Sequence, residues 1–84
     1  MNEGMYIVKD TQIGAIAAGP FRCKNNAQAV RMFSDACEDK NGLFWKHPAH
    51  FCLMRIGSID GETCLITDVL EVTLCVASDF VKGE

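Results

Sequence analysis

The residues best suited to chemistry lie together in one nine-residue segment, Leu43 to Phe51. The segment contains three aromatic side chains, a lysine, a proline and both histidines of the chain. Histidine binds metals and transfers protons near neutral pH, whereas cations and aromatic rings together bind nucleic acid. The segment therefore holds the chain's main candidates for metal binding, acid–base catalysis and nucleic-acid binding.

The segment matches no catalytic or metal-binding pattern. His47 and His50 are three residues apart with Pro48 between them, and no cysteine or carboxylate stands at a usual zinc-ligand spacing from them. Cys23 or Cys52 could meet a histidine in the fold, but nothing in the sequence marks either thiol as activated. The glycines form neither a dinucleotide-binding motif nor a phosphate-binding loop. We therefore expect no catalytic residue, no metal site and no cofactor.

Single-stranded nucleic acid fits the segment better. Proteins hold single strands by cations along the phosphate backbone and by aromatic faces that stack on bases, at about 1–3 kcal/mol per base. The predicted nucleic-acid-binding residues are Arg22, Lys24, Arg31, Phe44, Trp45, Lys46, His47, His50 and Arg55. The alternative for Phe44 and Trp45 is that they close the open end of the core, because aromatic side chains dominate small cores.

The charge distribution allows the middle of the chain to face a polyanion, although the whole chain is acidic. The formal net charge is −3. Residues 22–55 contain six Lys or Arg against three acids, whereas residues 56–84 contain one lysine and six acids. The overall acidity favours a competing hypothesis, a protein-interaction module that docks through residues 43–51 or an edge strand. A small-molecule sensor at a dimer interface is a third class, which only the α+β shape favours.

One helix and several strands must position these residues. Asn25 and Asn26 are good N-cap residues for an amphipathic helix of about four turns. Its apolar positions recur at three- and four-residue spacing, at Ala27, Val30, Phe33, Ala36 and Cys37. Asn41-Gly42 then supplies residues that end a helix.

Strand patterns precede and follow the helix. A first hairpin is expected from Met5 to Ala18, ending at Gly19-Pro20. The run from Phe51 to Ile56 is apolar on both faces, which is typical of a central strand, so Arg55 must reach the sheet margin or find an acidic partner. A tight turn at Asp60-Gly61, a return strand at residues 64–66 and an alternating strand at residues 72–76 follow. We predict one α+β domain over residues 1–84, an antiparallel sheet of four or five strands with one helix packed on one face.

Composition predicts the oligomeric state of this domain and its cellular compartment. A chain of 84 residues with 49% hydrophobic residues has little interior to hide them, so we expect a homo-oligomer, most simply a dimer. No apolar run reaches the length of a membrane helix, and the N-terminus lacks a secretory signal. The five isolated cysteines are each expected to be small buried apolar residues in a reducing cytoplasm.

Six motifs occur in order along nearly the whole chain: Met5-Tyr6-Ile7-Val8-Lys9-Asp10, Gly19-Pro20-Phe21, Ala29-Val30-Arg31-Met32-Phe33-Ser34-Asp35, Lys46-His47-Pro48, Arg55-Ile56-Gly57 and Ala77-Ser78-Asp79-Phe80. In this order they resemble the small non-structural protein of gokushoviruses. Gokushoviruses are tail-less phages of the Microviridae with single-stranded DNA genomes. The combination of Ala-x-Arg-x-Phe with Lys-His-Pro is the most specific part of the resemblance.

The resemblance implies a non-structural phage protein that is made in the host bacterial cytoplasm. It also implies a DNA-binding or replication-associated role around the switch from duplex replication to single-strand synthesis and packaging. Members often have Glu-Asp where this chain has Ala49-His50, so the segment is less negative here. We therefore expect an accessory protein that binds DNA, preferentially single-stranded. The alternative is a module that docks on a phage or host replication protein without direct DNA contact.

Overall fold

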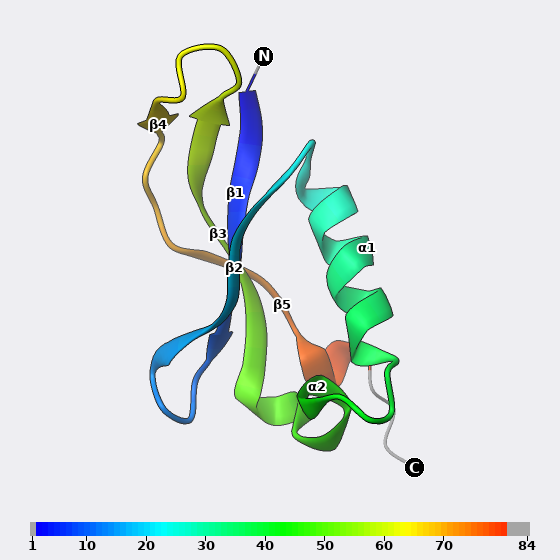
Figure 1. Cartoon of the computed structure of the whole chain (residues 1–84). Helices are drawn as coiled ribbons and strands as arrows, with labels where there is room; N and C mark the ends of the chain where they lie inside the picture. Colours follow the sequence, from blue (N-terminus) through cyan, green and yellow to red (C-terminus); the bar gives the residue numbers. More distant parts are fainter. Residues whose placement is uncertain (1, 81–84) are drawn as a thin grey trace.

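The computed structural model describes residues 2–80, which form one twisted antiparallel sheet with a helix on one face (Figure 1). The elements in chain order are β1 (Asn2–Asp10), β2 (Ala15–Cys23), α1 (Asn26–Cys37), α2 (Leu43–Lys46), the 3₁₀ helix η1 (Pro48–His50), β3 (Phe51–Asp60), β4 (Ile66–Thr67), β5 (Val72–Val76) and the 3₁₀ helix η2 (Ala77–Asp79). The predicted α+β class is confirmed, with five strands in the sheet.

The central position of β3 organises the sheet. β3 pairs along its length with β1, and β1 pairs in turn with β2. On its other side β3 pairs with β5 near its start, from Cys52 to Arg55, and with β4 near its end, at Ser58 and Ile59. Because β3 has neighbours on both sides, its backbone is satisfied and both faces carry apolar side chains, as the sequence predicts for a central strand.

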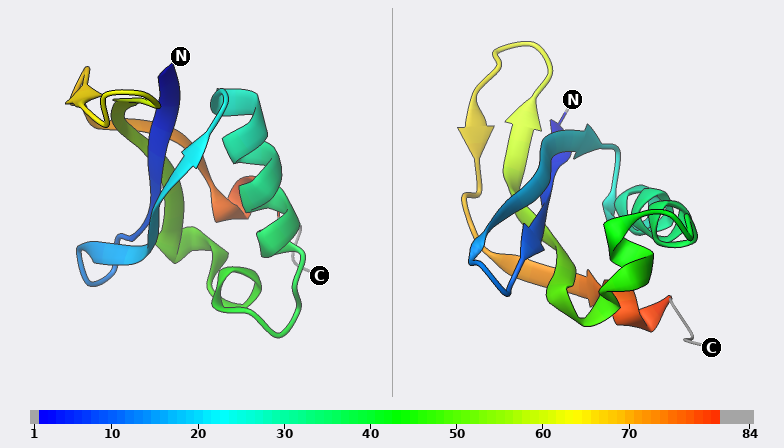
Figure 2. Two further views of the ribbon diagram at one scale, coloured as in Figure 1. Left: turned by 45° about the horizontal axis from the view of Figure 1, so that its top comes forward. Right: turned by 60° about the horizontal axis from the view of Figure 1, so that its bottom comes forward.

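The two faces of the sheet carry two separate apolar clusters. Alternate side chains of a strand point to opposite faces, so Tyr6 and Leu53 lie beneath α1, whereas Ile7 and Met54 lie on the far face. The cluster beneath α1 is the main core, and Tyr6 and Leu53 are fully buried in it. Figure 2 shows α1 covering only one side of the sheet, which leaves the far face without a helix.

α1 begins where the sequence predicts but ends earlier. The side chain of Asn25 accepts a hydrogen bond from the backbone N–H of Gln28, which caps the first turn. Ala29, Phe33 and Cys37 face the core. The helix has 12 residues, or about three turns, rather than the four expected.

β2 differs from the prediction because it continues through Gly19-Pro20 to Cys23. Gly19 has φ +97°, a conformation that glycine adopts without steric cost. Pro20 lacks a backbone N–H, and β2 is an edge strand on which that donor is not needed for the ladder. The two residues therefore bend the edge strand without ending it.

The cysteines are structural with one exception. Cys23, Cys37 and Cys52 are buried and Cys75 is half-buried, whereas Cys64 is exposed in the turn after β3. The prediction that every cysteine is buried is therefore wrong for Cys64, which has φ 63° in a turn with little packing around it. Within residues 2–80, no helix is long and apolar enough to cross a membrane.

Candidate nucleic-acid interface

The segment from Leu43 to Phe51 folds into two short helices, α2 and η1, and ends at the first residue of β3. In α2 the backbone N–H of His47 donates to the carbonyl of Leu43 at 2.8 Å, and in η1 the N–H of His50 donates to the carbonyl of His47 at 3.0 Å. The carbonyl of His50 accepts from the backbone N–H of Thr11 at 2.8 Å, which ties the segment to the β1–β2 turn. These bonds fix the backbone that carries both histidines.

The two histidines form a parallel pair. The rings of His47 and His50 lie with an interplanar angle of 2° and centroids 5.5 Å apart. His47 is exposed and His50 is half-buried, while the neighbouring Lys46 is exposed. The arrangement can offer an aromatic face beside an ammonium group, the two contacts that single strands use.

Phe44 and Trp45 have different surroundings. The ring centroid of Phe44 lies 5.4 Å from that of Phe33 and 4.8 Å from that of Phe51, so Phe44 packs with the core. The packing of Phe44 therefore agrees with the alternative given above, in which this ring closes the open end of the core. Trp45 is half-buried, and the Nζ atom of Lys40 lies 5.6 Å from its ring centroid. Trp45 thus combines an aromatic ring with a second nearby cation.

Arg55 is held inside the protein by neutral groups. Its Nη1 atom donates to Asn26 Oδ1 at 2.8 Å and to the hydroxyl of Tyr6 at 3.4 Å, and its Nη2 atom donates to Ser58 Oγ at 2.9 Å. The hydroxyl of Tyr6 donates in turn to Asn26 Oδ1 at 2.7 Å. Within residues 2–80 Arg55 makes no ion pair. The sequence-based expectation of an acidic partner or the sheet margin is wrong, because three oxygens from β1, β3 and α1 surround the guanidinium instead.

The phenol of Tyr6 behaves as a neutral donor in this network. Burial raises the pKa of Tyr6, and the positive charge of Arg55 opposes that rise without cancelling it. The network therefore joins the start of α1 to the two central strands. Sequence reasoning missed Tyr6, Asn26 and Ser58. The one available signal was an arginine in an otherwise apolar central strand, which requires several oxygen partners nearby.

The other predicted cations lie on the outside. Arg22 forms an ion pair with Glu3, with 3.5 Å between Nε and Oε1, and its side chain is 57% exposed. Phe21 stacks on Tyr6 beneath α1. Because neighbouring side chains of a strand point to opposite faces, the side chain of Arg22 projects from the far face of the sheet. Lys24 and Arg31 are exposed, in the connection before α1 and on α1 itself.

The nine predicted residues therefore do not form one surface. Arg22, Lys24 and Arg55 lie near the start of α1, whereas the residues of α2 and η1 lie beyond its end (Figure 1). α1 has 12 residues, which is about 18 Å of rise, and Arg31 lies partway along it. Trp45, Lys46, His47 and His50 lie within six residues of each other in α2, η1 and the residue between them, and we call these four residues the α2–η1 cluster.

The α2–η1 cluster lies in a stretch of sequence without acidic residues. Residues 40–59 contain no Asp or Glu. Asp60 and Glu62 lie in the β3–β4 turn, which Figure 1 places at the opposite end of a molecule 45 Å long. Backbone N–H groups of Glu62 and Thr63 lower the pKa of Asp60 and so keep that carboxylate charged. Two other carboxylates lie closer to the cluster: Asp10, which pairs with Phe51 at the end of β1, and Asp79 in η2, which contacts η1. The charge at the α2–η1 end is therefore mixed, with the cations on α2 and the acids on β1 and η2.

The rest of the site's chemistry is limited. Among residues 2–80, no group of three or more His, Cys, Asp or Glu side chains is placed to hold a metal ion. Burial raises the pKa of Cys37 and Cys75 to about 11, so these thiols are poor nucleophiles near neutral pH.

Comparison with known proteins places the chain in a family. Neither the curated proteins nor the solved structures contain a significant match. One family model, described as Phage ORF5 protein, matches residues 3–80, which run from β1 to the end of η2. The match covers the whole described fold apart from Asn2, including Arg55 with its partners and the α2–η1 cluster. The chain therefore belongs to the Phage ORF5 protein family and is a bacteriophage protein.

Proposed function

We propose that this phage protein is the small non-structural protein of a gokushovirus, a member of the Microviridae, and that it binds single-stranded DNA in the host bacterial cytoplasm. It has no catalytic role in this proposal. It acts in genome replication or in the switch to single-strand synthesis and packaging. The ordered motifs from Met5 to Phe80 support the gokushovirus origin, and membership of the Phage ORF5 family agrees with it.

The DNA contact is assigned to the α2–η1 cluster. The observation that carries the proposal is the parallel pair of imidazoles of His47 and His50, with the exposed Lys46 next to His47 in the sequence. The outer face of a histidine or of Trp45 stacks on a base, while Lys46 neutralises a phosphate. Lys24 and Arg31 extend the contact along the exposed side of α1 on longer strands.

Three of the nine sequence-predicted residues have a smaller place in this proposal. Phe44 packs with the core, Arg55 is bonded to three oxygens, and Arg22 is paired with Glu3. Each already has a partner within the chain, so a DNA contact would require it to give up that interaction.

The alternative is a module that docks on a phage or host replication protein. The observation in its favour is an apolar hollow between β2 and the start of α2, lined in part by Ala17, Leu43 and Phe44, with a volume of about 330 Å³. The side chain of Leu43 is 62% exposed beside it. A partner residue inserted here would make an apolar contact that depends little on salt.

Fluorescence anisotropy with a labelled single-stranded oligonucleotide tests the proposal. We expect affinity to fall with salt at a log–log slope of about −0.7 per phosphate neutralised. Lys46→Gln should weaken binding at low salt and make that slope shallower by about 0.7, since one phosphate contact is lost. Leu65→Glu is the matched control, because it also lowers the net charge by one but lies in the connection between β3 and β4. It should bind nearly as the unmodified protein does.

Two outcomes separate the hypotheses. Absence of binding to single strands at low salt overturns the DNA proposal. Binding to a replication protein that survives high salt and Lys46→Gln, and is lost in Trp45→Ala, supports the docking alternative instead.

A further inference from the structure

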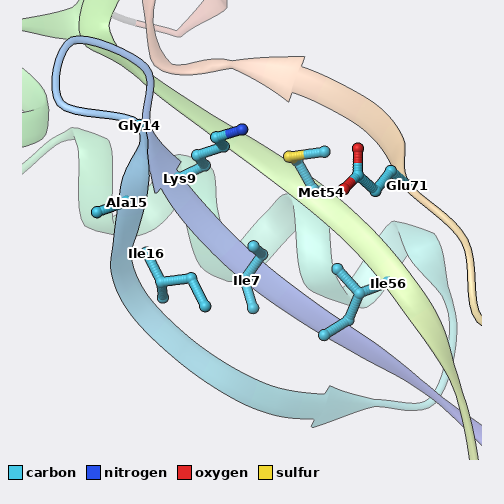
Figure 3. A pocket seen from close by; sticks show the side chains of 8 residues that line it. All are labelled: Ile7, Lys9, Gly14, Ala15, Ile16, Met54, Ile56 and Glu71. Atoms are coloured by element: carbon cyan, nitrogen blue, oxygen red, sulfur yellow. The ribbon is translucent and has the colours of Figure 1, made fainter.

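The far face of the sheet carries a groove that α1 does not cover. Its floor is formed by Ile7 of β1 together with Met54 and Ile56 of β3, and Ile16 of β2 closes one side (Figure 3). The volume is about 240 Å³. Gly14 and Ala15 leave the groove open at one end because they have little or no side chain. The floor is already well packed, since Ile7 and Met54 are 7% and 8% exposed.

The two rims of the groove carry opposite charges. Lys9 of β1 lines one side and Glu71, which precedes β5, lines the other, with Met54 between them in Figure 3. Neither residue forms an ion pair with another residue in the range 2–80. Both charges are thus free to meet charges on an incoming surface.

The chain segments beside the groove contain the two most exposed large apolar residues described. Val69, two residues before Glu71, is 80% exposed, and Ile13, next to Gly14, is 74% exposed. Exposed apolar side chains of this size mark interaction surfaces when they border a groove. The groove thus has one charge of each sign, and an exposed apolar residue lies within two residues of the lining on each side.

We propose that a second copy of this chain occupies the groove, so that the protein is a twofold dimer through the sheet face opposite α1. A twofold interface uses the same surface on both subunits and must be complementary to itself. The groove meets this requirement. Lys9 of one copy lies opposite Glu71 of the other, and Ile13 of each copy packs into the groove of its mate.

The surface fits a second copy better than a small ligand. A molecule that filled about 240 Å³ would leave Ile13 and Val69 in water. Stable interfaces bury about 800 Å² from each partner, which requires the rims as well as the floor. A partner of one charge sign would leave either Lys9 or Glu71 facing a like charge, whereas a second copy pairs both. This inference is independent of the proposed DNA binding.

Sedimentation equilibrium tests the dimer. We expect a mass of twice the 9.2 kDa monomer, and dissociation on dilution that is at least tenfold easier for Ile13→Glu. Leu43→Glu is the matched control, because it places the same new charge at an apolar side chain 62% exposed on α2. It should remain dimeric.

A charge exchange makes the test specific. Lys9→Glu and Glu71→Lys alone should each weaken the dimer, and the two together should restore it, because the pair is rebuilt with reversed signs. Circular dichroism of each variant checks that the sheet is folded. A monomeric unmodified protein at high concentration overturns the proposal. So does a dimer that resists Ile13→Glu and Lys9→Glu, or a double variant as weak as the two single ones.

Discussion

Replacing Arg55 with methionine tests whether this arginine stabilises the fold or binds DNA. The substitution removes the bonds to Asn26 and Ser58 and the longer one to Tyr6. Hydrogen bonds to a charged group contribute about 1.5–3 kcal/mol each, and the loss leaves the hydroxyl of Ser58, a residue 4% exposed, without this donor. Removal of a half-buried charge and burial of the methionine side chain offset part of this loss. We expect a net destabilisation of about 2 kcal/mol.

Urea denaturation followed by circular dichroism measures this difference. For a domain of this size, about 2 kcal/mol corresponds to a fall in Tm of roughly 8–16 °C. Arg31→Met is the matched control. Arg31 is exposed on α1 and forms no ion pair within the described residues, so its loss should change the free energy of unfolding by less than about 0.5 kcal/mol.

A double-mutant cycle with Tyr6→Phe sharpens the result. The phenol donates to Asn26 Oδ1, the same atom that accepts from Arg55, so we expect the two substitutions to be coupled by at least about 0.5 kcal/mol. The reasoning is refuted if Arg55→Met unfolds at the same urea concentration as the unmodified protein. If that variant also loses DNA binding, the guanidinium is a phosphate contact and not a structural tie.

Three further changes follow from the packing. Gly4→Ala places a methyl group against the buried ring of Tyr6, and we expect a loss of about 1–3 kcal/mol in the free energy of unfolding by urea titration. Phe44→Ala should cost about 3 kcal/mol in the same assay, because the ring packs with two other phenylalanines; a cost near zero would show that the ring is free. The raised pKa values of Cys37 and Cys75, about 11, favour the neutral thiols of the folded state. Stability is therefore complete below the ordinary thiol pKa and should decline as pH rises from about 9 to 11. Melting curves across that pH range test this prediction, and a Tm that does not change with pH contradicts it.

Local signals in the sequence predicted the parts of the fold that depend on local physics. Asn25 caps α1 because its side chain can reach the first-turn N–H groups, whatever the rest of the chain does. Phe51–Ile56 is apolar on both faces, which is typical of a central strand, and β3 pairs with β1 on one side and with β5 on the other. The turn after Asp60 was predicted in place but not in form: positive φ occurs at Cys64 and not at Gly61, and the return strand β4 is Ile66–Thr67 instead of residues 64–66. The Asp60 carboxylate, which accepts from the N–H groups of Glu62 and Thr63, stabilises this longer turn.

The missed features depend on contacts between distant residues. Arg55 bonds to Tyr6 and Asn26, which are 49 and 29 residues away in the chain, so no local pattern shows the network. The segment after α1 becomes α2 because Phe44 packs between rings from α1 and β3, a tertiary contact that overrides weak helix propensity. The candidate site was predicted as a stretch of sequence, but the positions of its cations relative to α1 required the fold.

The proposed dimer surface and the α2–η1 cluster meet at the β1–β2 turn, where Thr11 donates to the carbonyl of His50, so oligonucleotides of two lengths are needed to test whether dimer and DNA contact act together. A dimer carries two α2–η1 clusters, and a strand long enough to reach both gains affinity by effective concentration, by about a hundredfold or more. Ile13→Glu should therefore weaken binding to a long oligonucleotide, while an oligonucleotide that covers one cluster binds as before. Leu65→Glu, with the same charge change at a residue 64% exposed, controls for the change in net charge, and the short oligonucleotide controls for the new carboxylate near the cluster. If the two lengths respond equally to Ile13→Glu, the clusters of a dimer do not share one strand, and each protomer binds DNA by itself.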